Sequence, residues 1–444
     1  MTGRLGVVHV AVAAALIAAA VIVLLYLDGG RPGTPTGLAV AMLCAVLFAV
    51  LPWAIIPVGV LGGALASNAV GATDVRSVVI VHAVPLAAGC AALLARRIAG
   101  LDRGHYRLPR YGIAMIVVLA VTAAGAVYGL AAGNGPMAVV VAGYQVAVIP
   151  AYFFIAVFSL VEPDWRRKAA ILFIIGLAVL TIIQFDLPGR HGGLMSMLAF
   201  PPLIVLAGRS RGWPRAGYAV LAAVFAGDVA LSSYRGLWVG SLVALVVLIL
   251  RGGRPVRQGL VATGIAAAFG VAAVSTLRAV GRLTGDRIGL VVESLDRSAG
   301  YRLPEATIGL DVFAARPLFG AGLGQTTPNV YVDGFRVTDV GPVYHAYYVL
   351  LLANLGIIGL CAVLWPVLRA MLDGLRERDT LPLAFAALIC GFLVSAVFAG
   401  PTDGHWEWGL LPALVLLTRP APAGGPTAGW SRTWSDPVAT VTAR

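Results

Sequence analysis

Long apolar runs alternate along the chain with short clusters of arginine. The apolar runs are long enough to cross a hydrocarbon core of roughly 30 Å as α-helices. They predict membrane spans near 5–27, 77–95, 111–131, 136–160, 169–185, 192–207, 216–232, 236–250, 259–277, 345–366, 383–399 and 406–418. The first of these runs exceeds the apolar core of about 7–15 residues in a cleaved signal peptide, so we interpret it as a retained span.

The region between the first two spans has to leave and re-enter the membrane on one side. Two short helices, 37–50 and 53–70, with Pro52 at the bend between them, would do this; a re-entrant hairpin is the alternative. The pattern therefore predicts an all-α polytopic membrane protein with 12–14 transmembrane helices. We expect residues 1–418 to form a single transmembrane domain and 419–444, rich in Pro, Gly, Ala and Ser, to be a disordered tail.

The arginine clusters predict the orientation of the spans. Basic clusters follow every second span, near 96–110, 166–168, 209–215, 251–257 and 369–378, with more arginine in the tail. Loops rich in Lys and Arg stay in the cytoplasm, and the opposite loops here carry few basic residues. We therefore expect a cytoplasmic membrane protein with both termini in the cytoplasm.

Composition agrees with the pattern of the spans. Of 444 residues, 59% are hydrophobic and only 12% are charged, whereas soluble domains carry about 25% charged residues. The net charge of +12 comes from clusters between apolar runs, which argues against a nucleic-acid-binding surface. The cysteines lie inside apolar runs without metal-ligand spacing, so we expect neither a disulfide framework nor a structural zinc site.

One hydrophilic stretch, 278–344, is far longer than an ordinary connection of about 4–6 residues. It carries seven arginines and seven acidic residues, and the predicted topology places it outside the cell. Its middle part predicts a helix of about three turns after Pro304, ending at Arg316–Pro317. Glycines at 320, 322 and 324 follow. This part is either a surface amphipathic helix with a flexible turn or an external active-site lid whose glycines present N–H groups to an anion.

Two further positions border the predicted external space. His345 lies where the loop becomes a helix, beside Tyr344 and Tyr348; it is either a polar anchor at the interface or a general base, since the imidazole pKa is near 6.5. Arg235 lies at the junction of two spans in LSSYRGLWVG. It either extends to lipid headgroups or binds phosphate through its planar guanidinium inside the bundle.

These elements resemble the O-antigen ligase and O-antigen polymerase superfamily. The resemblance rests on SSYRG, then YRLPEATIGLDVFAARPLFGAGLG, then HAYYVLLLANLGIIGL, in that order within about 230–366. The family shows a Ser-x-x-Arg-Gly helix start, an Arg before a Pro-Leu-x-Gly-x-Gly turn, and a His that opens a helix ending in Leu-Gly-x-x-Gly-Leu. The sequence departs from the pattern at Ala346, where many members have Asn, and at Asn354, where Glu is frequent.

The resemblance implies a GT-C type glycosyltransferase that needs no metal or other cofactor. Such enzymes transfer a glycan from an undecaprenyl or related polyprenyl diphosphate to an acceptor hydroxyl outside the cytoplasmic membrane, in polysaccharide biosynthesis of the cell envelope. It makes Arg235 and Arg302 the positions that neutralise the diphosphate and His345 the base. We expect substrate contacts at a second set of positions: Arg316, Arg190, His191, Gly322, Gly324, Tyr344 and Tyr348.

Other functions remain open at this point. A polysaccharide flippase or other transporter would explain the spans and the cationic residues, although transporters often show internal repeats and none is visible here. A metal-dependent GT-C enzyme would need acidic ligands in its first external loop, where Asp28 is the only candidate. A cell-wall polymerase of the shape-elongation-division class lacks its motifs here. The acceptor, either another repeat unit or a lipid, peptidoglycan or protein, is not determined by the sequence.

Overall fold

The computed structural model describes eleven stretches of the chain. They are residues 44–69, 75–99, 108–185, 192–232, 235–279, 302–325, 330–332, 335–337, 346–377, 380–398 and 404–419. The predicted span 5–27 and the predicted tail from 420 onward lie outside the described residues.

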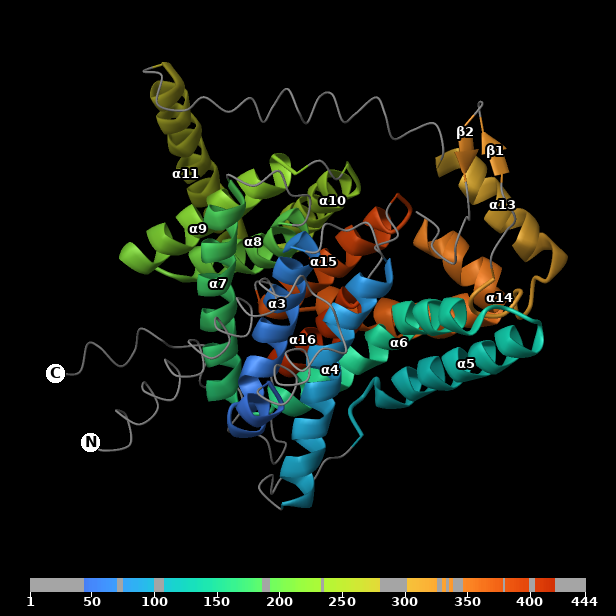
Figure 1. Cartoon of the computed structure of the whole chain (residues 1–444). Coiled ribbons are helices and arrows are strands. Elements are labelled where there is room, and N and C mark those ends of the chain that lie inside the picture. Colours follow the sequence, from blue (N-terminus) through green and yellow to red (C-terminus); the bar gives the residue numbers. More distant parts are fainter. Residues whose placement is uncertain are drawn as a thin grey trace.

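Helices account for almost all of the described chain (Figure 1). In chain order they are η1 (Pro52–Ala54), α3 (Ile55–Ala69), α4 (Val75–Ile98), α5 (Gly112–Ala131), α6 (Pro136–Ser159), α7 (Pro163–Phe185), α8 (Gly192–Arg209), α9 (Trp213–Ala230), α10 (Arg235–Arg251), α11 (Arg254–Ala279), α13 (Arg302–Ala315), α14 (Tyr347–Leu375), α15 (Leu381–Ser395) and α16 (Glu407–Thr418). Residues 44–50 are helical as well. Two short strands, β1 (Val330–Val332) and β2 (Phe335–Val337), pair antiparallel with Tyr331 opposite Arg336.

The helices confirm the predicted fold class, an all-α polytopic membrane protein. Their bounds follow the predicted spans closely, and Pro52 lies at the predicted bend before α3. Two details of the long loop differ from the expectation. Helix α13 begins at Arg302, so Pro304 lies within its first turn, where a missing N–H costs no hydrogen bond. The sequence also did not predict the hairpin of β1 and β2.

Most of the helices fall into three groups, with α3, α4 and α7 packed beside them. Helices α8, α9, α10 and α11 pack together, α5 and α13 pack on α14, and α6, α15 and α16 lie between these two groups (Figure 1). The central helices are apolar on every side, and most residues of α15 and α16 are buried. A helix that is hydrophobic all round belongs in the core of such a bundle.

Glycines allow the closest helix crossings. Gly240 of α10 lies against the backbone of Gly391 in α15. Gly409 of α16 lies against the carbonyl of Ile149 in α6, and Gly208 of α8 against that of Pro255 in α11. A Cβ at any of these glycines would clash with backbone atoms. Small residues at crossings are typical of membrane helices, where close van der Waals packing drives association.

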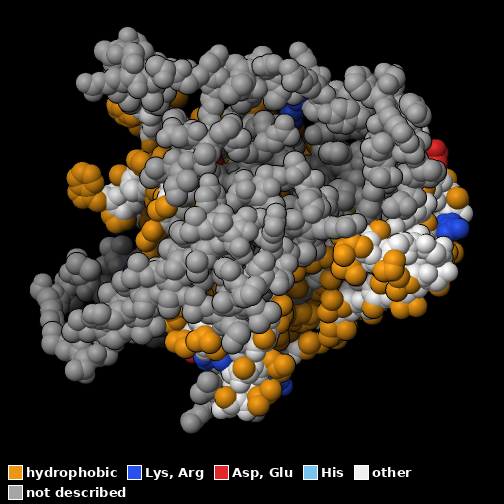
Figure 2. Space-filling view, viewed as in Figure 1, with side chains coloured by type: hydrophobic (Ala, Val, Ile, Leu, Met, Phe, Trp, Pro, Cys, Tyr) orange, Lys and Arg blue, Asp and Glu red, His pale blue; other side chains and the backbone are white. Residues whose placement is uncertain are grey.

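Large apolar side chains also cover much of the described surface. On α5, Ile113, Ile116, Val117 and Val127 are all exposed, and Figure 2 shows hydrophobic side chains gathered over this helix. By length and composition, α5, α6 and α14 could each cross a membrane, and several other apolar helices are shorter. A soluble protein rarely exposes so much contiguous apolar surface, so the bundle is a membrane protein whose outer surface faces lipid.

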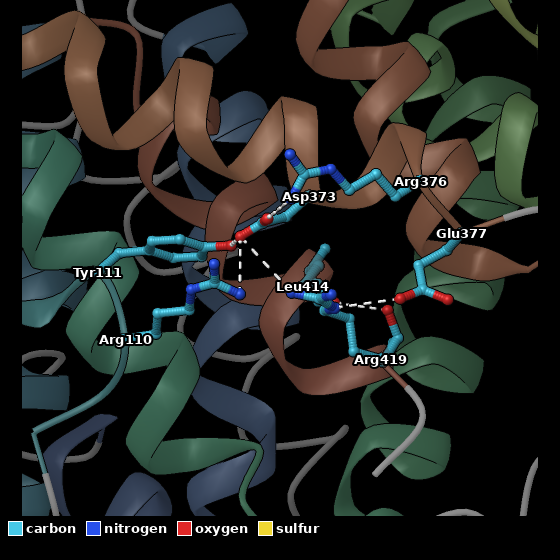
Figure 3. A network of polar contacts seen from close by, with 8 residues as sticks. Arg110, Tyr111, Asp373, Arg376, Glu377, Leu414 and Arg419 are labelled. Carbon is cyan, nitrogen blue, oxygen red and sulfur yellow. Dashed lines mark hydrogen bonds and ion pairs between the residues drawn. The ribbon is translucent and has the colours of Figure 1, made fainter. Parts of the chain in front are cut away.

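Three arginines from different parts of the chain, Arg110, Arg376 and Arg419, meet at one end of the bundle, which we call the Asp373 end (Figure 3). The side chain of Asp373, fully buried, accepts a hydrogen bond from the Tyr111 hydroxyl at 2.7 Å. Its carboxylate also pairs with Arg110 at 3.0 Å, and with Arg376 and Arg419 at 3.5 Å each. Helices α5, α14 and α16 are thereby joined at this end. Nearby, Arg251 of α10 donates to the Leu375 carbonyl at 2.8 Å.

Candidate functional site

The first residue of α14, Tyr347, is held by contacts of its backbone N–H, its hydroxyl and its ring. Its N–H donates to the Ala396 carbonyl at 3.0 Å, and its hydroxyl donates to the Gln145 carbonyl at 2.8 Å. Its ring lies edge-on to His405, with centroids 4.4 Å apart, and to Trp408 at 5.2 Å. The side chain is completely buried. We call this part of the bundle, opposite the Asp373 end of α14, the Tyr347 end.

A buried pair of ionisable residues supports Tyr347. His405 Nδ1 and Glu407 Oε1 are in direct contact, and both side chains are almost fully buried. The second carboxylate oxygen, Glu407 Oε2, has no hydrogen-bond partner among the described residues. His405 also stacks on Trp408, with centroids 4.9 Å apart. The sequence did not predict this pair. The signal for it was the presence of two ionisable residues in the apolar run GHWEWGLLPAL, because burying such residues in a membrane bundle costs free energy.

Arg235 also lies at the Tyr347 end, as the first residue of α10. Its Nη2 atom is buried and has no hydrogen-bond partner in the part of the chain that the structure describes. The turn before it is fixed by Trp238 Nε1, which donates to the Val229 carbonyl at 2.9 Å. The Ser232 hydroxyl donates to the same carbonyl at 2.7 Å. The turn therefore precedes a guanidinium group whose Nη2 donors are not used by any of the described residues.

Helix α15 places Arg235 and the start of α14 at the same end of the bundle. About a turn beyond Arg235, Gly240 contacts Gly391 of α15. The last turn of α15 contacts α14 in turn, because the Tyr348 hydroxyl donates to the Leu393 carbonyl at 2.7 Å. Arg235 and Tyr348 thus lie on either side of the same helix end.

The glycine-rich stretch after α13 is inserted into the bundle. The N–H of Ala321 donates to the Ala353 carbonyl at 2.8 Å, that of Gly322 to Asn354 at 3.0 Å, and that of Leu323 to Gly125 at 3.0 Å. The Leu323 carbonyl accepts from Asn134 Nδ2 at 2.9 Å. The stretch therefore joins α14 to α5 and to the turn that follows α5.

This insertion corrects one of the two interpretations of the glycines. The N–H groups of Gly320, Ala321, Gly322 and Leu323 all donate to internal carbonyls, so these four groups are not free to bind an anion. Gly320, Gly322 and Gly324 have φ angles of 67°, 85° and 78°, a region that glycine adopts without strain. A Cβ at Gly322 would lie 2.6 Å from the Gly129 backbone. The glycines are required by the conformation and by the close packing.

The inserted stretch docks where α14 is interrupted. Gly356 has φ 65° and ψ −166°, which is not helical. On one side of the break, the carbonyls of Ala353 and Asn354 accept from the inserted stretch; on the other, Ile357 N–H donates to the Pro317 carbonyl at 2.9 Å. The break would expose backbone groups inside the bundle, at several kcal/mol each, and the stretch satisfies them. Two separate sequence motifs, PLFGAGLG and NLGIIGL, thus form one structural unit.

Of the other predicted site residues, some have described side chains and some do not. Arg316 is exposed directly after α13, and Arg302 begins α13, with its side chain outside the described part. Arg190, His191, Tyr344 and His345 lie outside the described residues. The chain directly after two of these positions is described: Gly193, two residues after His191, packs against Ser232, which precedes Arg235 by three positions, and Tyr347 follows His345 by two positions. Among the described residues, no group of three or more His, Cys, Asp and Glu could hold a metal ion.

The fold and this site define a polytopic helical membrane protein with a buried cationic group and an inserted loop segment at one end. Residues 217–364 match the family model described as O-antigen ligase. The match runs from α9 to α14 and includes Arg235, the inserted glycines and the break at Gly356, so it confirms the resemblance to the O-antigen ligase superfamily. At the level of the family, this indicates a membrane enzyme with a polysaccharide ligase or polymerase role, acting on lipid-linked glycans. A comparison with curated proteins finds no match.

Proposed function

We propose that the chain is a metal-independent GT-C type glycosyltransferase that uses a polyprenyl-diphosphate-linked glycan as donor. The observation that carries the proposal is the buried Nη2 of Arg235, which has no hydrogen-bond partner among the described residues. A planar guanidinium group binds two phosphate oxygens at once. A diphosphate bound there would supply the missing acceptor, and the lipid part would reach the site through the bilayer.

The reaction needs two kinds of groups, and the chain offers both. The acceptor hydroxyl oxygen attacks the anomeric carbon of the donor sugar, and the bond from that carbon to the diphosphate oxygen breaks. His345 takes the hydroxyl proton as general base. Arg235 and Arg302 neutralise the charge that gathers on the departing diphosphate. Arg316, Arg190, His191, Tyr344 and Tyr348 are positioned in the sequence to contact sugars or donor near these groups.

The contacts that hold Tyr347 in place support the assignment of His345 as the general base. His345 precedes Tyr347 by two residues, so their Cα atoms are separated by at most about 7 Å. Backbone, hydroxyl and ring contacts hold Tyr347 in place, and a base requires a fixed position relative to its substrate. In this proposal the Tyr347 end faces the outside of the cytoplasmic membrane, and the arginine-rich Asp373 end faces the cytoplasm, as the positive-inside rule requires.

A transporter of lipid-linked glycans is the second candidate. The break in α14 favours it, because broken helices form the substrate sites of many transporters. In those sites the helix ends face the substrate. In this chain, backbone groups of Pro317 to Gly322 occupy carbonyls and N–H groups on both sides of the break. The break is thus filled by the chain itself, which supports the enzyme over the transporter.

The proposal is tested with purified His345→Ala, assayed for transfer and for binding of the donor lipid. We expect transfer to fall by roughly 10²–10⁴-fold, as is usual for loss of a general base. Donor binding should stay near the wild-type level, because the base acts on the acceptor. Ser395→Ala, which removes a buried hydroxyl that donates to the Phe392 carbonyl at the end of α15, is the control for local packing, because it touches no proposed substrate contact. Near-normal transfer by His345→Ala would show that this residue is only an interface anchor.

A further inference from the structure

A cavity of about 350 Å³ opens at the Asp373 end, far along α14 from the proposed transfer site. It lies between the start of α5 and the second half of α14, and it is lined by Arg110, Tyr111, Ala114, Trp365, Pro366 and Arg369. Its volume lies at the lower end of the range for small-molecule sites. None of its lining residues takes part in the proposed transfer reaction, and Arg369 lies beyond the segment that matches the O-antigen ligase family.

The surroundings of the cavity carry more positive than negative charge. Arg110, Arg376 and Arg419 all pair with the single carboxylate of Asp373, and Glu377 adds one more pair with Arg419 at 3.3 Å. Arg369 is exposed and has no carboxylate partner among the described residues. Four arginines thus face two carboxylates, and Figure 3 shows three of these arginines converging on Asp373. The cavity is therefore a favourable place for an anion.

The surface of α5 and α14 beside the cavity is apolar. Trp365 lies one helical turn before Arg369 and is 67% exposed. On α5, which lines the cavity through Ala114, the side chains of Ile113, Ile116 and Val117 are exposed. Tryptophan is enriched at the boundary between headgroups and acyl chains, and basic pockets between membrane helices bind anionic headgroups. A free phosphate ion would use the arginines but leave this apolar flank without a role.

We propose that this cavity binds the headgroup of an anionic phospholipid. Arg110 and Arg369 contact the phosphate, Trp365 packs against the glycerol region, and the acyl chains lie along the exposed side chains of α5 and α14. Because Arg110 shares Asp373 with Arg419, which follows α16, the bound lipid stabilises the junction of α5, α14 and α16. The lipid is a structural ligand here, separate from the glycan donor at the opposite end.

The test measures the thermal midpoint of the full chain in detergent during titration with phosphatidylglycerol, phosphatidylcholine or inorganic phosphate. We expect phosphatidylglycerol to raise the midpoint in a saturable way and the other two to have little effect. Arg369→Ala should weaken the apparent affinity for phosphatidylglycerol about tenfold, the usual size for loss of one charge-assisted hydrogen bond. Arg257→Ala, an exposed arginine of α11 away from the cavity, is the matched control and should titrate like the wild type.

Three outcomes would overturn the proposal. Equal shifts with phosphatidylglycerol and phosphatidylcholine would mean that the bundle responds to lipid without a headgroup site. A shift of the same size with inorganic phosphate would assign the cavity to a free anion. Equal affinities for Arg369→Ala and Arg257→Ala would show that phosphatidylglycerol binds elsewhere. Because Arg369 makes no described ion pair, we expect Arg369→Ala to fold normally. Its affinity for phosphatidylglycerol can then be compared directly with that of Arg257→Ala.

Discussion

The two ends of the bundle use arginine in opposite ways. At the Asp373 end, a buried carboxylate collects Arg110, Arg376 and Arg419, and Arg251 donates to a helix-terminal carbonyl. At the Tyr347 end, Arg235 keeps a buried Nη2 that no described residue accepts from. The same residue type thus joins helices at one end, and at the other it keeps a buried donor without a described partner, which we propose binds the diphosphate.

The arginines at the two ends differ in how many of their hydrogen-bond donors the described residues use. A guanidinium group that is paired with a carboxylate has part of its charge neutralised and fewer N–H donors left for a ligand. One that is buried without a full set of acceptors raises the free energy of the empty site, and an anionic ligand removes that penalty. Position in the sequence does not separate the two, because both kinds lie at the ends of apolar helices.

The largest expected effect is a difference in glycan transfer between variants at the two ends of α10. Arg235→Ala should reduce glycan transfer about 10²-fold and weaken donor binding, because the charge faces the diphosphate in both ground and transition states. Arg251→Ala, at the other end of α10, should leave transfer unchanged. Arg235→Lys should restore only part of the loss, since it keeps the charge without the planar fork. Equal transfer by the two alanine variants would remove the functional difference between the ends.

The inserted glycine stretch gives the next largest expected effect, on stability. Gly322→Ala places a Cβ 2.6 Å from the Gly129 backbone at a φ of +85°. The strain and the lost docking should lower the free energy of unfolding by about 3 kcal/mol. Gly217→Ala is the matched control, because its Cβ meets no atom within 4 Å. Unfolding in mixed micelles measures both, and equal stability would mean that the stretch is not docked.

A smaller loss of stability is expected at the opposite end. Asp373→Asn keeps the size of the side chain but removes the charge that three arginines share. Because these arginines are partly exposed and screened by solvent, we expect a loss of only about 2 kcal/mol. The same unfolding assay checks this value, with transfer measured in parallel at a temperature where the variant is folded. A strong loss of transfer in folded Asp373→Asn would contradict the separation of the two ends.

Removal of metal ions should have no effect at either end. The proposed chemistry at the Tyr347 end uses arginine and histidine, so transfer should persist in excess EDTA. The assay compares initial rates of chelated and untreated enzyme. Recovery of a lost rate by magnesium or manganese would instead favour a metal-dependent enzyme, and Asp28 and Asp74 would then be the first positions to replace.

Most of the fold could be read from local pattern. The described helices lie close to the predicted apolar runs, and Pro52 marks the bend before α3. Apolar length and helix-breaking residues are properties of neighbouring positions, so the sequence carries them directly. The same holds for the order of the motifs between Arg235 and Gly356, which was enough to suggest the family that matches residues 217–364.

The sequence by itself therefore determined the class of protein, the spans and a set of candidate residues. Only the tertiary structure decided how they meet. It placed the glycines of PLFGAGLG against the break in α14, where they satisfy backbone groups, and it paired His405 with Glu407 behind Tyr347. It also gave Asp373 its arginines while leaving Nη2 of Arg235 without a described partner. Each of these depends on contacts between residues far apart in the chain, and such contacts leave no periodic signal in the sequence.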